Sequence, residues 1–272
     1  MTAAGPAREP LLRVDGLRKV YPSAQRPVVA IDGLSFDVAA GEFVCVVGPS
    51  GGGKSTLLKV VSGLLPPTDG RVLLDGAPVT GPVPGLAVVF QEYGRSLYAW
   101  KLYAWKTVRD NVALPLLARR VPRAYRHRRA QEALAAVGLA DAGRAYPWQL
   151  SGGMQQRVAI ARAIVGEPRV LLMDEPFAAV DAQTRADLED LVRAIWRRLG
   201  ITVLFITHDI DESVYLGGRV LVLSRAPATI RADLTVDLPA ERDQLTTRAD
   251  ARFAALRAEV FRLIAAEGTV RT

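Results

Sequence analysis

The sequence of 272 residues contains a single cysteine, Cys45, and only two histidines. One cysteine cannot form an internal disulfide, so the chain suits a reducing compartment. No apolar run reaches the roughly 18 to 20 residues that a membrane span needs. The first residues also lack the basic and then apolar pattern of a signal peptide. These absences predict a cytoplasmic protein without a membrane span of its own.

Lysine is scarce as well, since only five of the 35 basic residues are lysines and the rest are arginines. The formal net charge is +7. An arginine surplus can indicate binding to nucleic acid or to anionic lipid. Here the arginines are scattered, and their densest cluster, at 123–129, is short. We therefore expect no nucleic-acid partner and attribute the charge to general arginine usage and one phosphate site.

Short apolar runs alternate with helical patterns along most of the chain, which is typical of α/β folds. The runs are nearly continuous in Val, Leu and Ile, so they predict a sheet covered on both faces. The predicted strands are 43–47, 71–74, 86–90, 170–173, 202–207 and 219–223. The middle of the chain differs, because about 92–167 shows helical patterns at 108–118, 123–137 and 152–165 and no good strand.

A glycine-rich loop follows the first of these strands and fits the phosphate-loop pattern G-x-x-x-x-G-K-[ST]. Its glycines let backbone N–H groups wrap around phosphate oxygens, and the next helix points its positive end at them. We expect the lysine to neutralise phosphate charge and the following serine to bind Mg²⁺. The predicted contacts are Gly48, Pro49, Ser50, Gly51, Gly52, Gly53, Lys54, Ser55 and Thr56.

An acidic pair, Asp174 and Glu175, follows the strand predicted at 170–173. A phosphate loop of this kind requires a metal-binding carboxylate at the end of another strand. We expect Asp174 to hold Mg²⁺ through water. Glu175 is then placed to polarise the attacking water.

A second small-residue turn, Ser-Gly-Gly at 151–153, opens a helix and exposes another set of bare N–H groups. One triphosphate in one chain needs only one such site. Two sites therefore indicate two chains that face each other and share nucleotides.

The segment LSGGMQQRVAIARA, at 150–163, resembles the signature helix of the ATP-binding cassette (ABC) family. The rest of that family's pattern runs in order from about residue 12 to 235. By this resemblance Tyr21 stacks on adenine, and Gln91 contacts Mg²⁺ and the attacking water. In the same way Asp181 lies at the dimer seam, and His208 senses the γ-phosphate.

The resemblance implies a phosphate-loop core of ABC type with an antiparallel β subdomain and a helical subdomain. We expect the core at 9–91 and 168–240, the helical subdomain at 92–167 and a helical tail at 241–272. Glu175, His208 and Gln91 are the catalytic residues of this prediction. The partner copy contributes its signature residues to the same ATP in a head-to-tail dimer. These trans contacts are Leu150, Ser151, Gly152, Gly153 and Gln155.

Three stretches, at 91–112, 174–185 and 207–230, look like ATPase subunits of nitrate/sulfonate/taurine-type importers. The resemblance implies ATP hydrolysis, with ATP and Mg²⁺, that drives uptake of a small solute through a separate membrane permease. An extracytoplasmic solute-binding protein would deliver the solute, and the subunit would lie on the cytoplasmic side of the membrane. The ATPase subunit of an exporter remains the alternative. The solute itself cannot be named from the sequence.

The pentapeptide LYAWK occurs twice in tandem, at 97–101 and 102–106. Deleting either copy gives the same sequence, so the extra residues are one insertion, just beyond Gln91. Two hypotheses remain open. The insertion is either a neutral surface bulge or an enlarged aromatic surface for docking the permease.

Overall fold

The computed structural model describes residues 10–23, 26–90 and 102–266, and within it the chain forms two compact units. Unit 1 comprises Met1–Val83, Ile206–Arg242 and Thr246–Thr272, and unit 2 comprises Pro84–Phe205 and Asp243–Leu245. Among the described residues, no helix combines the length and the apolarity that a membrane span requires.

Unit 1 contains an antiparallel sheet with the strand order β2-β1-β4-β5. Central strand β1 pairs antiparallel with both β2 and β4. Buried and exposed residues alternate along β1 and β2, as expected for a sheet with one covered face. The expected antiparallel subdomain is thereby confirmed. Its strands are β1 (Leu12–Tyr21), β2 (Val28–Val38), β4 (Asp69–Leu74) and β5 (Ala77–Pro78).

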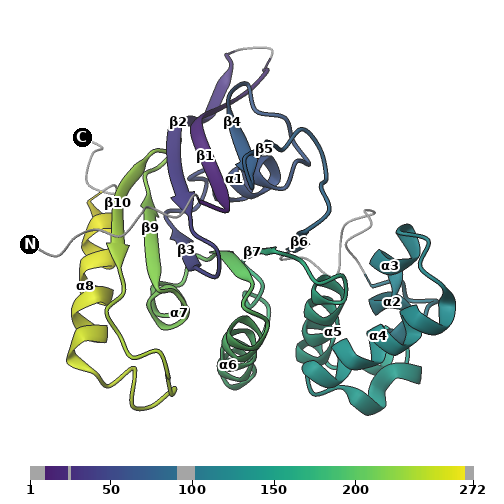
Figure 1. Ribbon diagram of the computed structural model, residues 1–272. Coiled ribbons are helices and arrows are strands. Elements are labelled where there is room, and N and C mark those ends of the chain that lie inside the picture. Colours follow the sequence, from purple (N-terminus) through teal and green to yellow (C-terminus); the bar gives the residue numbers. More distant parts are fainter. Residues whose placement is uncertain (1–9, 24–25, 91–101, 267–272) are drawn as a thin grey trace, which may run out of the picture. The chain divides into compact units, whose positions relative to one another are not determined.

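A second group of strands in unit 1 has the order β10-β9-β3. Strands β3 (Phe43–Val47) and β9 (Arg219–Leu223) are parallel, and β10 (Ile230–Thr235) is antiparallel to β9. Helices α1 (Lys54–Val61), α7 (Ile210–Leu216) and α8 (Ala251–Ala265) complete the unit. Helix α8 packs against α7 and β9 (Figure 1). Every residue of β3 is buried, because the strand is covered on both faces.

Unit 2 carries strands in the order β8-β7-β6, of which β6 and β7 are parallel. All residues of β7 and β8 are buried. The strands are β6 (Leu86–Val89), β7 (Val170–Asp174) and β8 (Thr202–Ile206). The long helix α6 (Ala182–Leu199) begins at an Asp181 cap and ends at Gly200, whose φ of 61° suits glycine.

The remainder of unit 2 is helical between residues 102 and 167. The helices are α2 (Val108–Val112), α3 (Leu114–Ala118), α4 (Arg123–Ala136) and α5 (Gly152–Ile164). The single helix predicted at 108–118 is in fact two, α2 and α3. Pro115, near the start of α3, has no N–H to continue the hydrogen bonding of α2.

Candidate functional site

The phosphate loop of unit 1 joins β3 to α1, and its glycines are required by close packing. A Cβ atom on Gly52 would lie 2.9 Å from the carbonyl oxygens of Pro49 and Ser224. Gly53 has a φ of 75°, and a Cβ there would lie 2.7 Å from the Ala30 oxygen. The loop therefore bends against two neighbouring backbone segments. Only residues without a side chain fit at these two positions.

Lys54 lies at the start of α1, and its side chain folds back over the loop. Its Nζ donates hydrogen bonds to the carbonyl oxygens of Gly48 (2.8 Å) and Pro49 (3.0 Å). Only 6% of the residue is exposed. The positive charge is therefore held at the loop itself, beside the first backbone N–H groups of α1. Both features suit a phosphate group.

Tyr21 ends β1 and contacts the same helix. Its hydroxyl lies 3.2 Å from Thr56 Oγ1. The ammonium of Lys19 lies 5.6 Å from the centre of the tyrosine ring and donates to the Pro66 carbonyl. These contacts fix the half-buried ring beside the phosphate-loop helix. Its role in adenine stacking remains a prediction.

His208 is exposed on the loop that follows β8, and its neighbours hold that loop tightly. The Thr207 N–H donates to the Val46 carbonyl of β3 (3.1 Å), and the Thr207 hydroxyl donates to the buried Glu212 carboxylate (2.5 Å). Asp209 caps α7, because its side chain accepts hydrogen bonds from the backbone N–H groups of Asp211 and Glu212. His208 therefore extends from a fixed loop attached to the strand that precedes the phosphate loop.

The acidic pair of unit 2 lies at the end of β7. Asp174 is 5% exposed, and Glu175 is half-buried. Glu175 has a φ of 43°, in the left-handed region that non-glycine residues seldom adopt. Such a conformation costs about 1–3 kcal/mol and occurs preferentially at functional sites. The described residues contain no group of three or more His, Cys, Asp or Glu side chains arranged to hold a metal.

The predicted signature segment forms the start of α5. Ser151 is the N-cap, and its hydroxyl accepts a hydrogen bond from the Met154 N–H (3.3 Å). The Gln155 amide nitrogen donates to the carbonyl oxygens of Pro147 and Leu150, each at 3.1 Å. This amide group therefore braces the segment of its own chain. Ser151 and Gly152 remain exposed at the helix start, as a contact with another chain requires.

Gly153 packs against the helix that follows Asp181, a contact that the sequence alone did not reveal. A Cβ on Gly153 would lie 2.4 Å from Thr184 Cγ2. The Thr184 N–H and hydroxyl donate to the two Asp181 carboxylate oxygens, at 2.9 and 2.7 Å. These hydrogen bonds hold the pKa of Asp181 below its usual value. The predicted signature and the predicted dimer-seam aspartate are thus in one packed cluster.

The predicted site residues divide between the two units. Unit 1 holds Tyr21, the loop residues 48–56 and His208, and unit 2 holds Asp174, Glu175, Asp181 and the signature residues. Gln91 lies outside the described residues.

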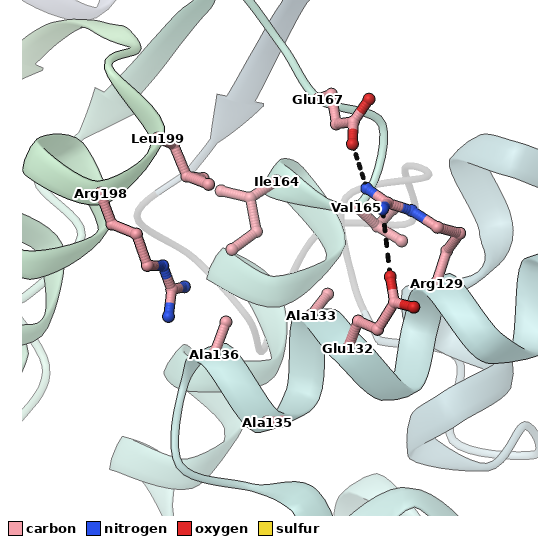
Figure 2. A pocket seen from close by; sticks show the side chains of 10 residues that line it. All are labelled: Arg129, Glu132, Ala133, Ala135, Ala136, Ile164, Val165, Glu167, Arg198 and Leu199. Atoms are coloured by element: carbon pink, nitrogen blue, oxygen red, sulfur yellow. Dashed lines mark hydrogen bonds and ion pairs between the residues drawn. The ribbon is translucent and has the colours of Figure 1, made fainter.

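A separate cavity of about 500 Å³ lies in unit 2 between α4, α5 and the end of α6. Figure 2 shows its apolar floor, which includes Ile164 and Leu199, with Arg198 on one side. On the other side Arg129 bonds to both Glu132 and Glu167. No predicted site residue lines this cavity.

Several known proteins are similar to this chain in sequence, and several solved structures are similar to it in fold. The ABC transporter family model matches residues 31–178. The nitrate import ATP-binding protein NrtD of Synechocystis is 44% identical over 85% of this chain and 85% of its own length. The taurine import ATP-binding protein TauB of Chromobacterium violaceum is 42% identical over 92% of this chain and 94% of its own.

Among solved structures, a dimeric ATP-binding cassette in a post-hydrolysis state, bound to ADP and phosphate, has a TM-score of 0.72 and 29% identity. The match covers 84% of this chain and all of that one. The family match takes in the phosphate loop, the signature segment and the acidic pair. The chain therefore belongs to the ABC transporter family and is an ATP-binding cassette of that family.

Proposed function

We propose that this chain is the ATP-hydrolysing subunit of an importer and powers uptake of a small solute through a separate membrane permease. The observation that carries the proposal is the phosphate loop, with its buried Lys54, in a chain that is 42–44% identical to import subunits. Nitrate and taurine in the names of those relatives support a small anionic or zwitterionic solute. The import subunits among the relatives favour the importer over the exporter alternative.

Unit 1 binds the nucleotide in this proposal. The loop N–H groups and the positive end of α1 bind the phosphate oxygens, and Lys54 pairs with the β- and γ-phosphates. Tyr21 stacks on adenine from its position beside Thr56. The Ser55 hydroxyl, exposed at the start of α1, and the Asp174 carboxylate are hard oxygen ligands that suit Mg²⁺. Mg²⁺, when bound, neutralises charge on the phosphates.

Glu175 and His208 carry out hydrolysis with Gln91. The Glu175 carboxylate accepts a proton from water as the water oxygen bonds to the γ-phosphorus. The bond from that phosphorus to the β–γ bridging oxygen breaks, and ADP and phosphate leave. His208 donates a hydrogen bond to the γ-phosphate and so stabilises the charge of the transition state. Gln91 positions the water and connects the site to the permease.

Two copies act together in a head-to-tail dimer. The exposed Ser151 and Gly152 at the start of α5 support this arrangement, because they are free of bulky cover in their own chain. They bind the ATP that the partner's phosphate loop holds, with Leu150, Gly153 and Gln155 shaping the same turn. The permease holds the dimer at the membrane. An extracytoplasmic solute-binding protein delivers the solute to the permease.

Reconstitution with the co-purified permease in vesicles tests this proposal. A panel of sulfonates, nitrate and related solutes, each with its binding protein, is presented on the face opposite the ATPase. We expect one solute to stimulate ATP hydrolysis and to accumulate on the ATPase side. Transport that runs away from the ATPase side would overturn the importer proposal in favour of the exporter.

A further inference from the structure

A cavity of about 660 Å³ lies in unit 1, between the start of α7 and the second half of α8. His208 and Asp211 line it from the α7 side, and Arg257 and Phe261 line it from α8. The C-terminal helix therefore adjoins the loop that carries His208. The proposed function gives α8 no role.

Helix α8 is anchored through its inner face. Phe253 and Val260 are 3% and 1% exposed, and α8 packs against α7 and β9. The Arg248 guanidinium, just before the helix, lies 5.0 Å from the Tyr215 ring centre and 5.9 Å from that of Phe253. The apolar contacts keep α8 in place, so the polar groups on its other positions are free to act on the His208 loop.

One ion pair joins the two elements at the rim of the cavity. Arg257 Nε lies 2.6 Å from Asp211 Oδ1. The backbone N–H of Asp211 donates to Asp209 Oδ1 (2.8 Å), which is the cap at the start of α7. Asp209 directly follows His208. The chain of contacts therefore runs from α8 through Arg257, Asp211 and Asp209 to the backbone of His208.

We propose that Arg257 is a positioning residue for ATP hydrolysis, through which α8 holds the His208 loop in its working conformation. The inference rests on the proposed role of His208. Arg257 contributes nothing to nucleotide binding, because it belongs to neither the phosphate loop nor the Tyr21 region. The Arg257 and Asp211 side chains are 61% and 37% exposed, so solvent screening keeps the effect modest.

A double-mutant cycle tests the pair in the full chain. Arg257→Gln and Asp211→Asn should each lower kcat about three- to fivefold, and the double variant should be no slower than either one. The Kd for ATP should stay within twofold, and the thermal midpoint should not change. The charge reversal, Arg257→Asp with Asp211→Arg, should recover most of the lost rate. The recovery shows that the pair itself matters, whereas a merely structural role would lower the thermal midpoint together with kcat.

Two arginines on the same helix provide matched controls. Arg252 pairs with Asp250 at the start of α8 (2.8 Å), and Arg262 lines the cavity and donates to the Ala258 carbonyl. Arg252→Gln and Arg262→Gln should leave kcat unchanged. Equal losses of kcat in these controls would show that the effect comes from general surface charge, and they would overturn the proposal.

Parallel assay of His208→Ala tests the role of His208 separately from that of Arg257. We expect this variant to bind ATP and to lose hydrolysis by at least 100-fold. If it does so while Arg257→Gln hydrolyses like the wild type, the positioning role is wrong and the proposed function stands. If His208→Ala itself hydrolyses at the wild-type rate, the proposed catalytic role of His208 is wrong. The positioning role of Arg257 is then wrong as well.

Discussion

Glu175 combines an uncommon backbone conformation with the position of the proposed base. Glu175→Gln keeps the shape of the side chain and the neighbouring Asp174 but removes proton acceptance. We expect ATP binding to persist and turnover to fall about 10²- to 10⁴-fold, the usual contribution of a general base. The variant should then accumulate as an ATP-bound dimer. Phosphate release and gel filtration with ATP measure the two effects.

Glu167 offers a control for this substitution. It is also a glutamate with a left-handed backbone, at a φ of 51°, but it is exposed and bonds to Arg129. Glu167→Gln should hydrolyse ATP at the wild-type rate. Near-normal turnover in Glu175→Gln would show that Glu175 is not the general base.

Gly153 is closely packed and its neighbour Gly152 is not, so the same substitution at each position tests the packing. Gly153→Ala should destabilise the nucleotide-free protein by about 1–3 kcal/mol, because its Cβ would collide with the Thr184 methyl group. Gly152→Ala should cost little, since nothing lies within 4 Å of its Cβ position. Chemical denaturation measures both.

Thr184→Ser deletes the methyl group and keeps the hydroxyl that bonds to Asp181. Combined with Gly153→Ala, it should restore most of the lost stability. Equal stability of the two alanine variants would mean that Gly153 and Thr184 do not pack as described.

At the scale of single residues, the sequence predicts those site residues whose pattern is local. The phosphate loop and the acidic pair are contiguous, so their spacing in the chain is itself the signal. The Gly153–Thr184 contact and the hydrogen bond from the Thr207 N–H to the Val46 carbonyl join segments that are far apart in the chain. No local pattern encodes such meetings, and neither contact could be predicted.

Helices and strands were predictable where hydrophobic period and capping agree. Strands β3 and β9 have the predicted bounds, because their apolar runs are flanked by polar residues or glycine. Helix α6 begins at Ala182, ahead of its first buried residue, Leu188, because the Asp181 cap fixes its first turn. The segment predicted as helical at 108–118 divides into α2 and α3, because Pro115 interrupts the backbone hydrogen bonds despite the helical period of the sequence.

The second LYAWK copy is the part of the duplication that the structure describes. Its Trp105 is 74% exposed and lies beside Tyr103, with ring centres 5.0 Å apart. The fully buried Asn111 bonds to the backbone of Tyr103, Lys106 and Thr107. The exposed Trp105 and the half-buried Tyr103 are therefore held on a fixed backbone, which supports the docking hypothesis. The neutral hypothesis is still open.

Deleting 102–106 distinguishes the two hypotheses. The remaining copy supplies the same residues to Asn111, so basal ATPase of the isolated subunit should stay within about threefold. Under the docking hypothesis, permease binding should weaken by roughly 1–3 kcal/mol, as for an aromatic anchor. Binding can be measured by titration with the detergent-solubilised permease.

Trp105→Ala is the companion variant, since it removes the anchor and keeps the backbone. Unchanged permease affinity in both variants would favour the neutral duplication. A collapse of basal ATPase after the deletion would contradict both hypotheses.

For the whole molecule, the central prediction is that each ATP is shared between two copies. Lys54→Ala should lose ATP binding in its own chain. Ser151→Arg should keep ATP binding by the monomer, yet block dimerisation and hydrolysis, because its long side chain occupies the place of the partner's γ-phosphate. Calorimetry on monomers and gel filtration with ATP measure these outcomes.

Ser151→Ala controls for the helix cap, since it removes the hydrogen bond to Met154 without adding bulk. It should cost about 1 kcal/mol of stability and impair dimerisation far less. Loss of monomer ATP affinity in Ser151→Arg, as severe as in Lys54→Ala, would rule out the head-to-tail arrangement.

The hydrogen bonds of Lys54 to the Gly48 and Pro49 carbonyls bear on which nucleotides the loop selects. An incoming phosphate must compete with these two internal acceptors for the same ammonium group. A phosphate oxygen adds the attraction between two full charges to the hydrogen bond, which a neutral carbonyl cannot do, so a sufficiently charged ligand displaces the carbonyls. Only the difference between the two sets of bonds adds to affinity. This competition penalises a monophosphate, which cannot reach the lysine with enough charge, more than it penalises a triphosphate.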